Sequence, residues 1–254
     1  MELQGRVAVV TGGTRGVGAG IARAFLAAGA EVVVCARRPP DAPVEAAGRS
    51  ARFVPVDLRD AGAVGDFFNT VVRRGGRLDV LVNNAGGTPH RLLGEAPAER
   101  HARVVELNLL APLTASLAAC EHLRAARGSV IMIGSVSATR PSPGSAAYGA
   151  AKAGLENLAR SMAVEWAPDV RVNTLVLGMV RTELASLHYG DEAGLAAVGR
   201  TVPLGRLAEP YEVGEAAVFL ASQRAGYVSG ASLLVHGGGE RPAFLDAATV
   251  NKED

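Results

Sequence analysis

Short, almost continuously apolar segments alternate along the chain with longer amphipathic segments. The apolar segments are rich in valine, isoleucine and leucine, and they predict strands over residues 6–11, 31–36, 51–57, 78–84, 128–135, 170–177 and 231–236. The longer segments predict helices over residues 17–28, 60–74, 97–125, 145–166 and 209–222. Strands that are apolar at nearly every position are typical of a parallel sheet buried on both faces.

This alternation predicts an α/β fold, a Rossmann-like doubly wound parallel sheet of about seven strands with helices on both faces. No Pro/Ser-rich or charged linker interrupts residues 1–254, so the chain is expected to form a single domain. Residues 183–203 are weakly amphipathic, contain three glycines and follow a strand, which predicts a mobile substrate lid. The last residues, 251–254, are expected to be frayed. Ligands of such a fold bind at the carboxyl ends of the strands.

A glycine-rich turn follows the first predicted strand, with Gly12, Gly16 and Gly18 in the pattern TGGTRGVG. Glycines permit positive φ and a close approach of the backbone to a pyrophosphate, and the amino terminus of the next helix then faces the anion. A plain tight turn would use the same residues, but the position after the first strand favours dinucleotide binding.

Arginines at two places point to the form of the dinucleotide. Arg37 and Arg38 follow the second predicted strand, where an enzyme that prefers NAD commonly has an acidic residue. Arg15, within the glycine turn, is expected to reach the same 2′-phosphate. The sequence therefore favours NADP(H) over NAD(H), although arginine is also the ordinary surface cation of this chain.

Tyr148 and Lys152 lie four residues apart on one predicted helix, so they share a face. A tyrosine has an ordinary pKa near 10 and is a poor acid–base group at neutral pH, and a cation one turn away is expected to lower that pKa. Ser135 ends the fifth predicted strand, where its hydroxyl can hydrogen-bond a substrate oxygen. Only two of the 26 basic residues are lysines, Lys152 and Lys252, so the use of a lysine here is notable.

Asn108 is a fourth candidate catalytic residue. Pro112, four residues later, has no N–H to donate to the Asn108 carbonyl oxygen, and its ring crowds that oxygen, so the helix is expected to kink there. A carbonyl group freed in this way can bind water. An ordinary helical asparagine is the alternative interpretation.

Taken together, these residues resemble the short-chain dehydrogenase/reductase family, in its branch of about this chain length. The likeness extends over almost the whole chain, through the TGxxxGxG turn, Asp57-Leu58, the Asn-Asn-Ala-Gly motif that ends at Gly86, Asn108, Ser135, the Tyr-x-x-x-Lys motif and the segment 178–182. The resemblance implies an enzyme that transfers a hydride between a nicotinamide cofactor and a secondary alcohol or ketone.

The resemblance also implies a role for each residue. Tyr148 would be the general acid or base, Ser135 would polarise the substrate, Lys152 would tune Tyr148 and hold the nicotinamide ribose, and Asn108 would hold a proton-relay water. The residues expected to bind the cofactor are Gly12, Thr14, Arg15, Gly16, Val17, Gly18, Arg37, Arg38, Asp57, Leu58, Asn84, Ala85, Gly86, Tyr148, Lys152, Val180 and Thr182. Two positions depart from the family pattern: Leu177 replaces a proline before Gly178, and His236 replaces an acidic residue before the last glycines.

Composition excludes other classes of protein. A net charge of +1 and 4% aromatic residues argue against nucleic-acid binding. No apolar run approaches the roughly 18 residues of a membrane helix, so the protein is expected to be soluble and cytoplasmic. Cys35 and Cys120 are expected to be buried thiols, and the histidines show no metal-ligand spacing, so no metal site is expected.

The substrate is the least determined part of the function. The expected pocket wall leans apolar and favours a bulky hydrophobic or alicyclic secondary alcohol or ketone. A 3-oxoacyl thioester is the alternative, with Arg91 and Arg140 as contacts for an acidic carrier. A redox sensor that binds NADP without turnover is the non-enzyme alternative, but such proteins typically lose the tyrosine or the lysine. The long helices 97–125 and 145–166 pair between subunits in the family, so a homotetramer is expected, or failing that a dimer.

Overall fold

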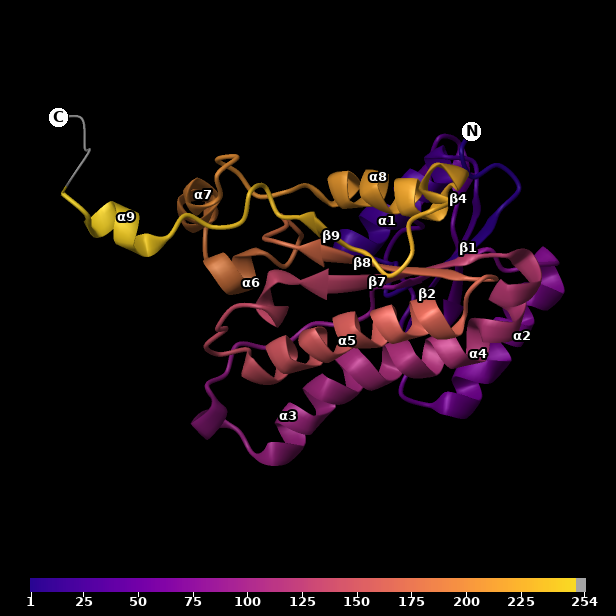
Figure 1. Cartoon of the computed structure of the whole chain (residues 1–254), viewed down its shortest axis with the longest axis horizontal. Helices are drawn as coiled ribbons and strands as arrows, with labels where there is room; N and C mark the ends of the chain where they lie inside the picture. Colours follow the sequence, from indigo (N-terminus) through magenta and orange to yellow (C-terminus); the bar gives the residue numbers. More distant parts are fainter. Residues whose placement is uncertain (250–254) are drawn as a thin grey trace.

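The computed structural model describes residues 1–249. The segment 251–254, which is expected to be frayed and contains Lys252, lies outside the described residues. Its centre is a parallel seven-stranded sheet in the order β5-β2-β1-β6-β7-β8-β9 (Figure 1). These strands are β1 (Val7–Thr11), β2 (Glu31–Ala36), β5 (Arg52–Pro55), β6 (Val80–Asn83), β7 (Ser129–Ser135), β8 (Arg171–Leu177) and β9 (Ser232–Val235). The predicted doubly wound α/β fold is confirmed. A small antiparallel hairpin, which the sequence pattern did not predict, consists of β3 (Glu45–Ala46) and β4 (Arg49–Ser50).

Helices cover both faces of the sheet. α1 (Gly16–Ala27) and α8 (Pro210–Ala221) pack together on one face, while α2 (Ala61–Gly75), α4 (Ala111–Ala126) and α5 (Ala146–Glu165) cover the other (Figure 1). Each face has its own apolar core, one around Ile21 and Phe25 of α1 and the other around Phe68 of α2 and Leu155 of α5. The apolar strands therefore contribute side chains to both cores.

The predicted helix over residues 97–125 consists of three consecutive pieces. α3 (Ala98–Val105) leads into the π-helical turn η2 (Glu106–Leu110) and then into α4. By length and composition alone the stretch Ala98–Ala126 could cross a membrane, so the expectation that no segment reaches this length is not met. Its α4 part nevertheless packs against α2, β6 and β7, which is the position of a core helix.

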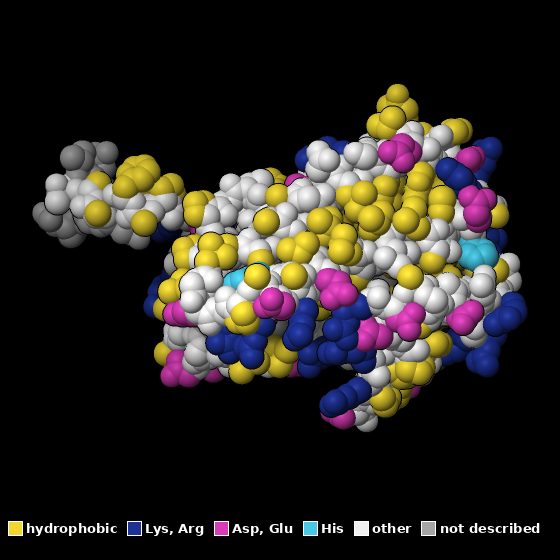
Figure 2. Space-filling model, turned by 90° about the horizontal axis from the view of Figure 1, so that it is seen from below, with side chains coloured by type: hydrophobic (Ala, Val, Ile, Leu, Met, Phe, Trp, Pro, Cys, Tyr) yellow, Lys and Arg dark blue, Asp and Glu magenta, His cyan; other side chains and the backbone are white. Residues whose placement is uncertain are grey.

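The remaining elements are short. The lid region holds α6 (Ser186–Tyr189) and α7 (Glu192–Thr201), and α9 (Ala243–Ala247) lies in the C-terminal segment that projects from the body (Figures 1 and 2). Three single 3₁₀ turns are η1 (Leu93–Glu95), η3 (Val136–Ala138) and η4 (Gln223–Ala225). The thiols of Cys35 and Cys120 are buried and unpaired, as predicted.

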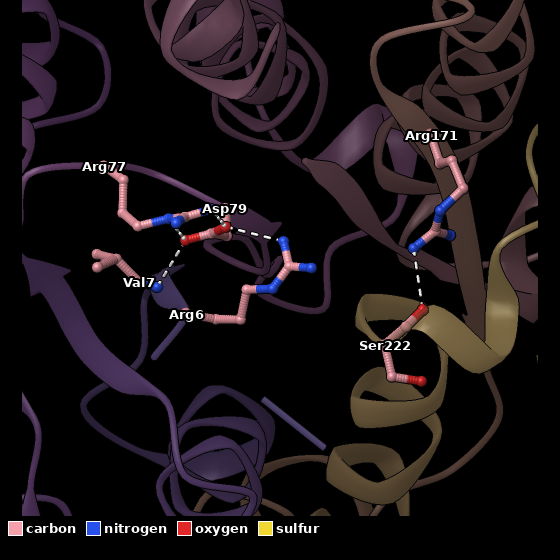
Figure 3. Close-up of polar contacts among 6 residues, drawn as sticks. All are labelled: Arg6, Val7, Arg77, Asp79, Arg171 and Ser222. Atoms are coloured by element: carbon pink, nitrogen blue, oxygen red, sulfur yellow. Dashed lines mark hydrogen bonds and ion pairs between the residues drawn. The ribbon is translucent and has the colours of Figure 1, made fainter. Parts of the chain in front are cut away.

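An ionic network holds the amino ends of the strands together, at the edge opposite the carboxyl ends (Figure 3). The carboxylate of Asp79 is fully buried and accepts hydrogen bonds from Arg6 at 2.9 Å, from Arg77 at 2.6 and 2.7 Å, and from the backbone N–H of Val7 at 2.9 Å. Arg171, at the start of β8, donates to the carbonyl oxygens of Leu220, Ser222 and Val228. This network therefore lies at the opposite edge from the carboxyl ends of the strands, where ligands of such a fold bind.

Candidate active site

The glycine turn between β1 and α1 is held in place by the loop after β6. The hydroxyl of Thr11 accepts hydrogen bonds from the N–H groups of Asn84 and Ala85, both at 3.0 Å, and donates to the carbonyl oxygen of Val82. The side-chain amide of Asn84 donates to the carbonyl oxygens of Thr11 and Gly12, at 2.9 and 3.1 Å. The family resemblance places Asn84 along the adenosine, and the geometry adds that its side chain fixes the turn itself.

Two glycines of this turn are required by close contacts. Gly12 has a φ of 61°, and a Cβ there would lie 2.9 Å from the Cα of Ala85. A Cβ at Gly18 would overlap the carbonyl oxygen of Gly12 and lie 2.5 Å from the amide nitrogen of Asn84. The turn is thus kept narrow by packing against the β6 loop, as the dinucleotide interpretation requires.

A cavity of about 700 Å³ opens beside this turn at the carboxyl ends of β1, β2 and β6. Its walls include eleven of the residues expected to bind the cofactor, which are Gly12, Thr14, Arg15, Gly16, Arg37, Asp57, Leu58, Asn84, Ala85, Gly86 and Thr182. The other expected residues stand outside this lining, and they are Val17, Gly18, Arg38, Tyr148, Lys152 and Val180. The narrow glycine cradle, the amino terminus of α1 and the arginines in the wall together fit a dinucleotide.

The wall of the cavity carries more cations than the sequence indicated. Arg59, Arg100 and Arg103 line it together with Arg37. Arg59 forms a double hydrogen bond with the carboxylate of Asp57, at 2.6 and 2.9 Å, and this bond lowers the pKa of Asp57 to about 2. Its place two residues after Asp57 is the only sequence signal that could have pointed to Arg59.

The four candidate catalytic side chains lie on elements that meet at the carboxyl edge of the sheet. Ser135 ends β7, and Tyr148 and Lys152 occupy the first two turns of α5, which packs on β7 and on η3. The nitrogen of Lys152 lies 5.4 Å from the centre of the Tyr148 ring. The hydroxyl oxygen of Ser135 accepts a hydrogen bond from the N–H of Ser137 at 3.2 Å, which orients it.

Burial shifts the pKa values of this pair in directions that oppose ionisation. It lowers the pKa of Lys152 to about 8 and raises the pKa of Tyr148, and a hydrogen bond with Ser135 offsets part of the second effect. The expected lowering of the Tyr148 pKa is therefore wrong for the cofactor-free chain. The reason is that the hydroxyl of Tyr148 is desolvated, and the cost of charging it there exceeds the effect of its hydrogen bond with Ser135.

Asn108 lies in η2 and its side chain is completely buried. Its amide oxygen accepts from the N–H of Gly87 at 3.0 Å, and its amide nitrogen donates to the carbonyl oxygens of Gly87 and Val104 at 2.9 and 2.8 Å. The kink expected from Pro112 takes the form of the π turn, in which the N–H of Ala111 donates to the carbonyl oxygen of Glu106. The side chain thus anchors the loop that borders the cavity.

The two departures from the family pattern, Leu177 and His236, lie close together in the structure, because Gly178 contacts His236. Leu177 is the buried last residue of β8. A Cβ at Gly178 would lie 2.8 Å from the Cβ of His236, so the backbone after β8 and His236 are in close contact. His236 therefore packs against the start of the loop that leads to Val180 and Thr182.

The lid region packs only partly on the body. Tyr189 of α6 is half-buried against the cluster of Ala185 and Leu195, whereas Leu187 is 75% exposed. At the same side, Arg140 forms an ion pair with Glu240. Among residues 1–249, no group of three or more His, Cys, Asp or Glu side chains is arranged to hold a metal ion.

Fold and site together define a dinucleotide-dependent oxidoreductase of the Rossmann type. Comparison with known proteins identifies its family, because residues 12–240 match the family model described as enoyl-(acyl carrier protein) reductase. The chain belongs to the short-chain dehydrogenase/reductase family, whose members use NAD(P)(H), and it is an enzyme that acts on CH–OH groups.

Individual relatives are similar over nearly their whole length. The chain is 39% identical to the L-fucose dehydrogenase of Oryctolagus cuniculus, over 93% of this chain and 85% of that protein. It is 35% identical to the 3-oxoacyl-[acyl-carrier-protein] reductase of Vibrio harveyi, over 94% and 98% of the two chains. The ligand-free structure of Thermoplasma acidophilum aldohexose dehydrogenase superimposes with a TM-score of 0.88 at 26% identity, covering 99% of this chain and 98% of that one.

Proposed function

We propose that the protein interconverts a secondary alcohol and a ketone with NADP(H) as the hydride carrier. The observation that carries this proposal is the placement of Tyr148 and Lys152 on α5 beside Ser135, at the edge of the sheet where the glycine turn opens. When bound, the nicotinamide supplies or accepts the hydride.

In the reductive direction, the hydroxyl of Ser135 donates a hydrogen bond to the carbonyl oxygen of the substrate. As the hydride adds to the carbonyl carbon, the electron pair of the C=O bond moves to oxygen, which takes the proton of the Tyr148 hydroxyl. Lys152 stabilises the phenolate that results, and water at the Asn108 carbonyl returns a proton from solvent. Oxidation of the alcohol reverses each step.

The preference for NADP(H) rests on the arginines in the wall of the cavity. Arg37 and Arg59 lie near Asp57, and Arg100 and Arg103 line the same cavity. Since Asp57 is already neutralised by Arg59, a 2′-phosphate would meet net positive charge. Fluorescence titration of the enzyme with NADPH and with NADH tests this preference, and tighter binding of NADH would overturn it.

For the substrate we propose a bulky hydrophobic or alicyclic alcohol or ketone, because the lid region presents exposed apolar side chains at Leu184 and Leu187, and Leu184 lines the large cavity. A second candidate is the oxidation of a cyclic sugar. The names of the L-fucose and aldohexose dehydrogenases favour it, and so does the polar Arg140–Glu240 pair, which could bind hydroxyl groups. The reduction of a 3-oxoacyl thioester stays the alternative. The name of the Vibrio harveyi relative favours it, whereas the ion pair of Arg140 with Glu240 leaves this arginine less available to an acidic carrier.

One assay separates these substrates. Purified enzyme is given alicyclic ketones and alcohols, aldoses such as L-fucose, and 3-oxoacyl thioesters, and the absorbance of reduced nicotinamide is followed. Turnover of alicyclic compounds at least tenfold faster than that of the other classes would support the first candidate. Faster oxidation of aldoses would replace it with the second.

We also propose that the protein assembles as a homotetramer, or failing that as a dimer. The face that carries α4 and α5 shows a cluster of hydrophobic side chains in its centre (Figure 2). Leu117 of α4 and Val164 of α5 are 60% and 79% exposed, and Leu110 just before α4 is 49% exposed. Pairing of these helices with a second copy would remove this apolar area from water.

A further inference from the structure

The first residue of the lid region contacts the glycine turn directly. The backbone N–H of Gly16, the first residue of α1, donates a 3.0 Å hydrogen bond to the carboxylate oxygen Oε2 of Glu183. The preceding residue, Thr182, lies so close that its methyl group would be 3.4 Å from a Cβ at Gly16. Glu183 also lines the large cavity, so its charge lies inside the space that fits a dinucleotide.

The amino terminus of α1 lacks an anion from its own segment. Within the described residues, the side chain of Arg15 at the N-cap position makes no capping hydrogen bond. The first turn of α1 contains no acidic residue. By contrast, α2 and α7 are capped by Asp60 and Asp191, which lie directly before them. Free N–H groups and the helix dipole attract negative charge, and Glu183 supplies it from 167 residues away.

We propose that Glu183 is an internal competitor of the cofactor pyrophosphate and thereby a determinant of cofactor affinity. In the cofactor-free enzyme its carboxylate occupies the anion position at the amino terminus of α1 and holds the lid region against the glycine turn. A pyrophosphate needs the same N–H groups, and two anions repel each other there, so binding displaces Glu183 and releases the start of the lid. This inference rests on the use of a dinucleotide by the enzyme.

The test compares the wild type with Glu183→Gln, which keeps the shape of the side chain and removes its charge. The dissociation constants of NADPH and NADH, measured by fluorescence, should both fall about two- to fivefold, because a charge at an exposed helix terminus has an effect of this size. Adenosine 2′-monophosphate has no pyrophosphate, so its dissociation constant should not change. Unchanged or weaker binding of the dinucleotides by Glu183→Gln would overturn the proposal.

The matched control is Glu192→Gln, which removes a lid carboxylate that pairs with Arg181 instead of the glycine turn. Its dinucleotide affinity should equal that of the wild type. An equal gain in both variants would show that general loosening of the lid is responsible, and this would also overturn the proposal.

A second measurement needs no cofactor. In the free enzyme, Glu183→Ala should speed hydrogen exchange in the peptide that contains Gly16 and in residues 183–203, relative to the wild type and to Glu192→Gln. Unchanged exchange would show that the contact does not hold the lid. Failure of the wild type to bind either dinucleotide would instead contradict the proposed function, and the exchange comparison separates these two results.

Discussion

The ammonium group of Lys152 donates a 2.7 Å hydrogen bond to the backbone carbonyl oxygen of Ile133, inside β7. The side chain is only 3% exposed, so the central cation of the site is anchored to the sheet in an almost dry environment. This arrangement fixes the position of Lys152 beside the Tyr148 ring, and the ammonium group loses most of its contact with water.

Because Lys152 is buried, the free energy of unfolding should depend on pH in the alkaline range. Because burial lowers the pKa of Lys152 from 10.5 to about 8, the unfolded chain binds more protons than the folded chain between these values. The destabilisation is therefore fully present below pH 8 and is relieved as the pH rises toward 10.5. Relative to Lys152→Met, the wild type should gain roughly 3 kcal/mol of unfolding free energy over this range, measured by urea denaturation. Parallel pH curves for the two proteins would contradict this.

Replacing Tyr148 by phenylalanine should abolish proton transfer and leave the fold intact. The side chain keeps its ring and loses the hydroxyl that hydrogen-bonds with Ser135. Turnover should fall at least about 100-fold, the usual contribution of a general acid or base, while the dissociation constant of the cofactor changes less than about twofold. If steady-state kinetics showed that most of the activity remained, another group would have to be the acid.

Asn108→Ala should damage both stability and catalysis. The substitution leaves the N–H and C=O groups of Gly87 and the carbonyl oxygen of Val104 without their partner. The expected loss is about 2 to 3 kcal/mol of unfolding free energy, together with a lower kcat, because the loop beside the cavity is no longer anchored. Chemical denaturation and kinetics at a temperature where the variant is folded separate the two effects. A fully active, fully stable variant would contradict the anchoring role.

Arg37 and Arg38 provide a matched pair for the cofactor preference. Arg37 lines the large cavity and its neighbour does not. Arg37→Ala should weaken NADPH binding about tenfold and leave NADH binding unchanged, since only NADPH carries the extra phosphate. Arg38→Ala should bind both cofactors like the wild type. An equal loss for both cofactors in Arg37→Ala would assign this arginine to the shared part of the dinucleotide.

The exposed apolar face offers a test of assembly. Leu117→Arg places a charge where α4 would meet a second copy, and it should shift the protein to a smaller oligomer in light scattering after size exclusion. Leu187→Arg, on the lid and even more exposed, serves as the control and should leave the mass unchanged. A wild type that is monomeric at micromolar concentration would refute the tetramer.

Local patterns explain what could be predicted from the sequence. Strands buried on both faces have a simple apolar signature, and Tyr148 and Lys152 are brought together by one helical turn. The buried state of Cys35 and Cys120 followed from their apolar neighbours in the same way. Each of these inferences depends on residues that are near one another in the chain.

Contacts between distant segments explain what could not be predicted. Asp79 and Arg6 are 73 positions apart in the sequence, and Glu183 and Gly16 are 167 positions apart, so no local pattern indicates either hydrogen bond. The direction of the Tyr148 pKa was also missed, because desolvation depends on how completely α5 and β7 enclose the hydroxyl. The spacing of four residues identifies Lys152 as the cation beside Tyr148, whereas the shift of its pKa depends on how deeply the packing buries it.

The burial of both cysteines also makes the lid accessible to specific labelling. Burial raises the pKa of Cys35 to about 12 and raises that of Cys120 as well, so neither thiol is nucleophilic at neutral pH. A cysteine introduced at the exposed position of Leu187 would therefore react far faster with a maleimide dye than either native thiol. Movements of the lid can thus be followed by fluorescence without first removing the native cysteines.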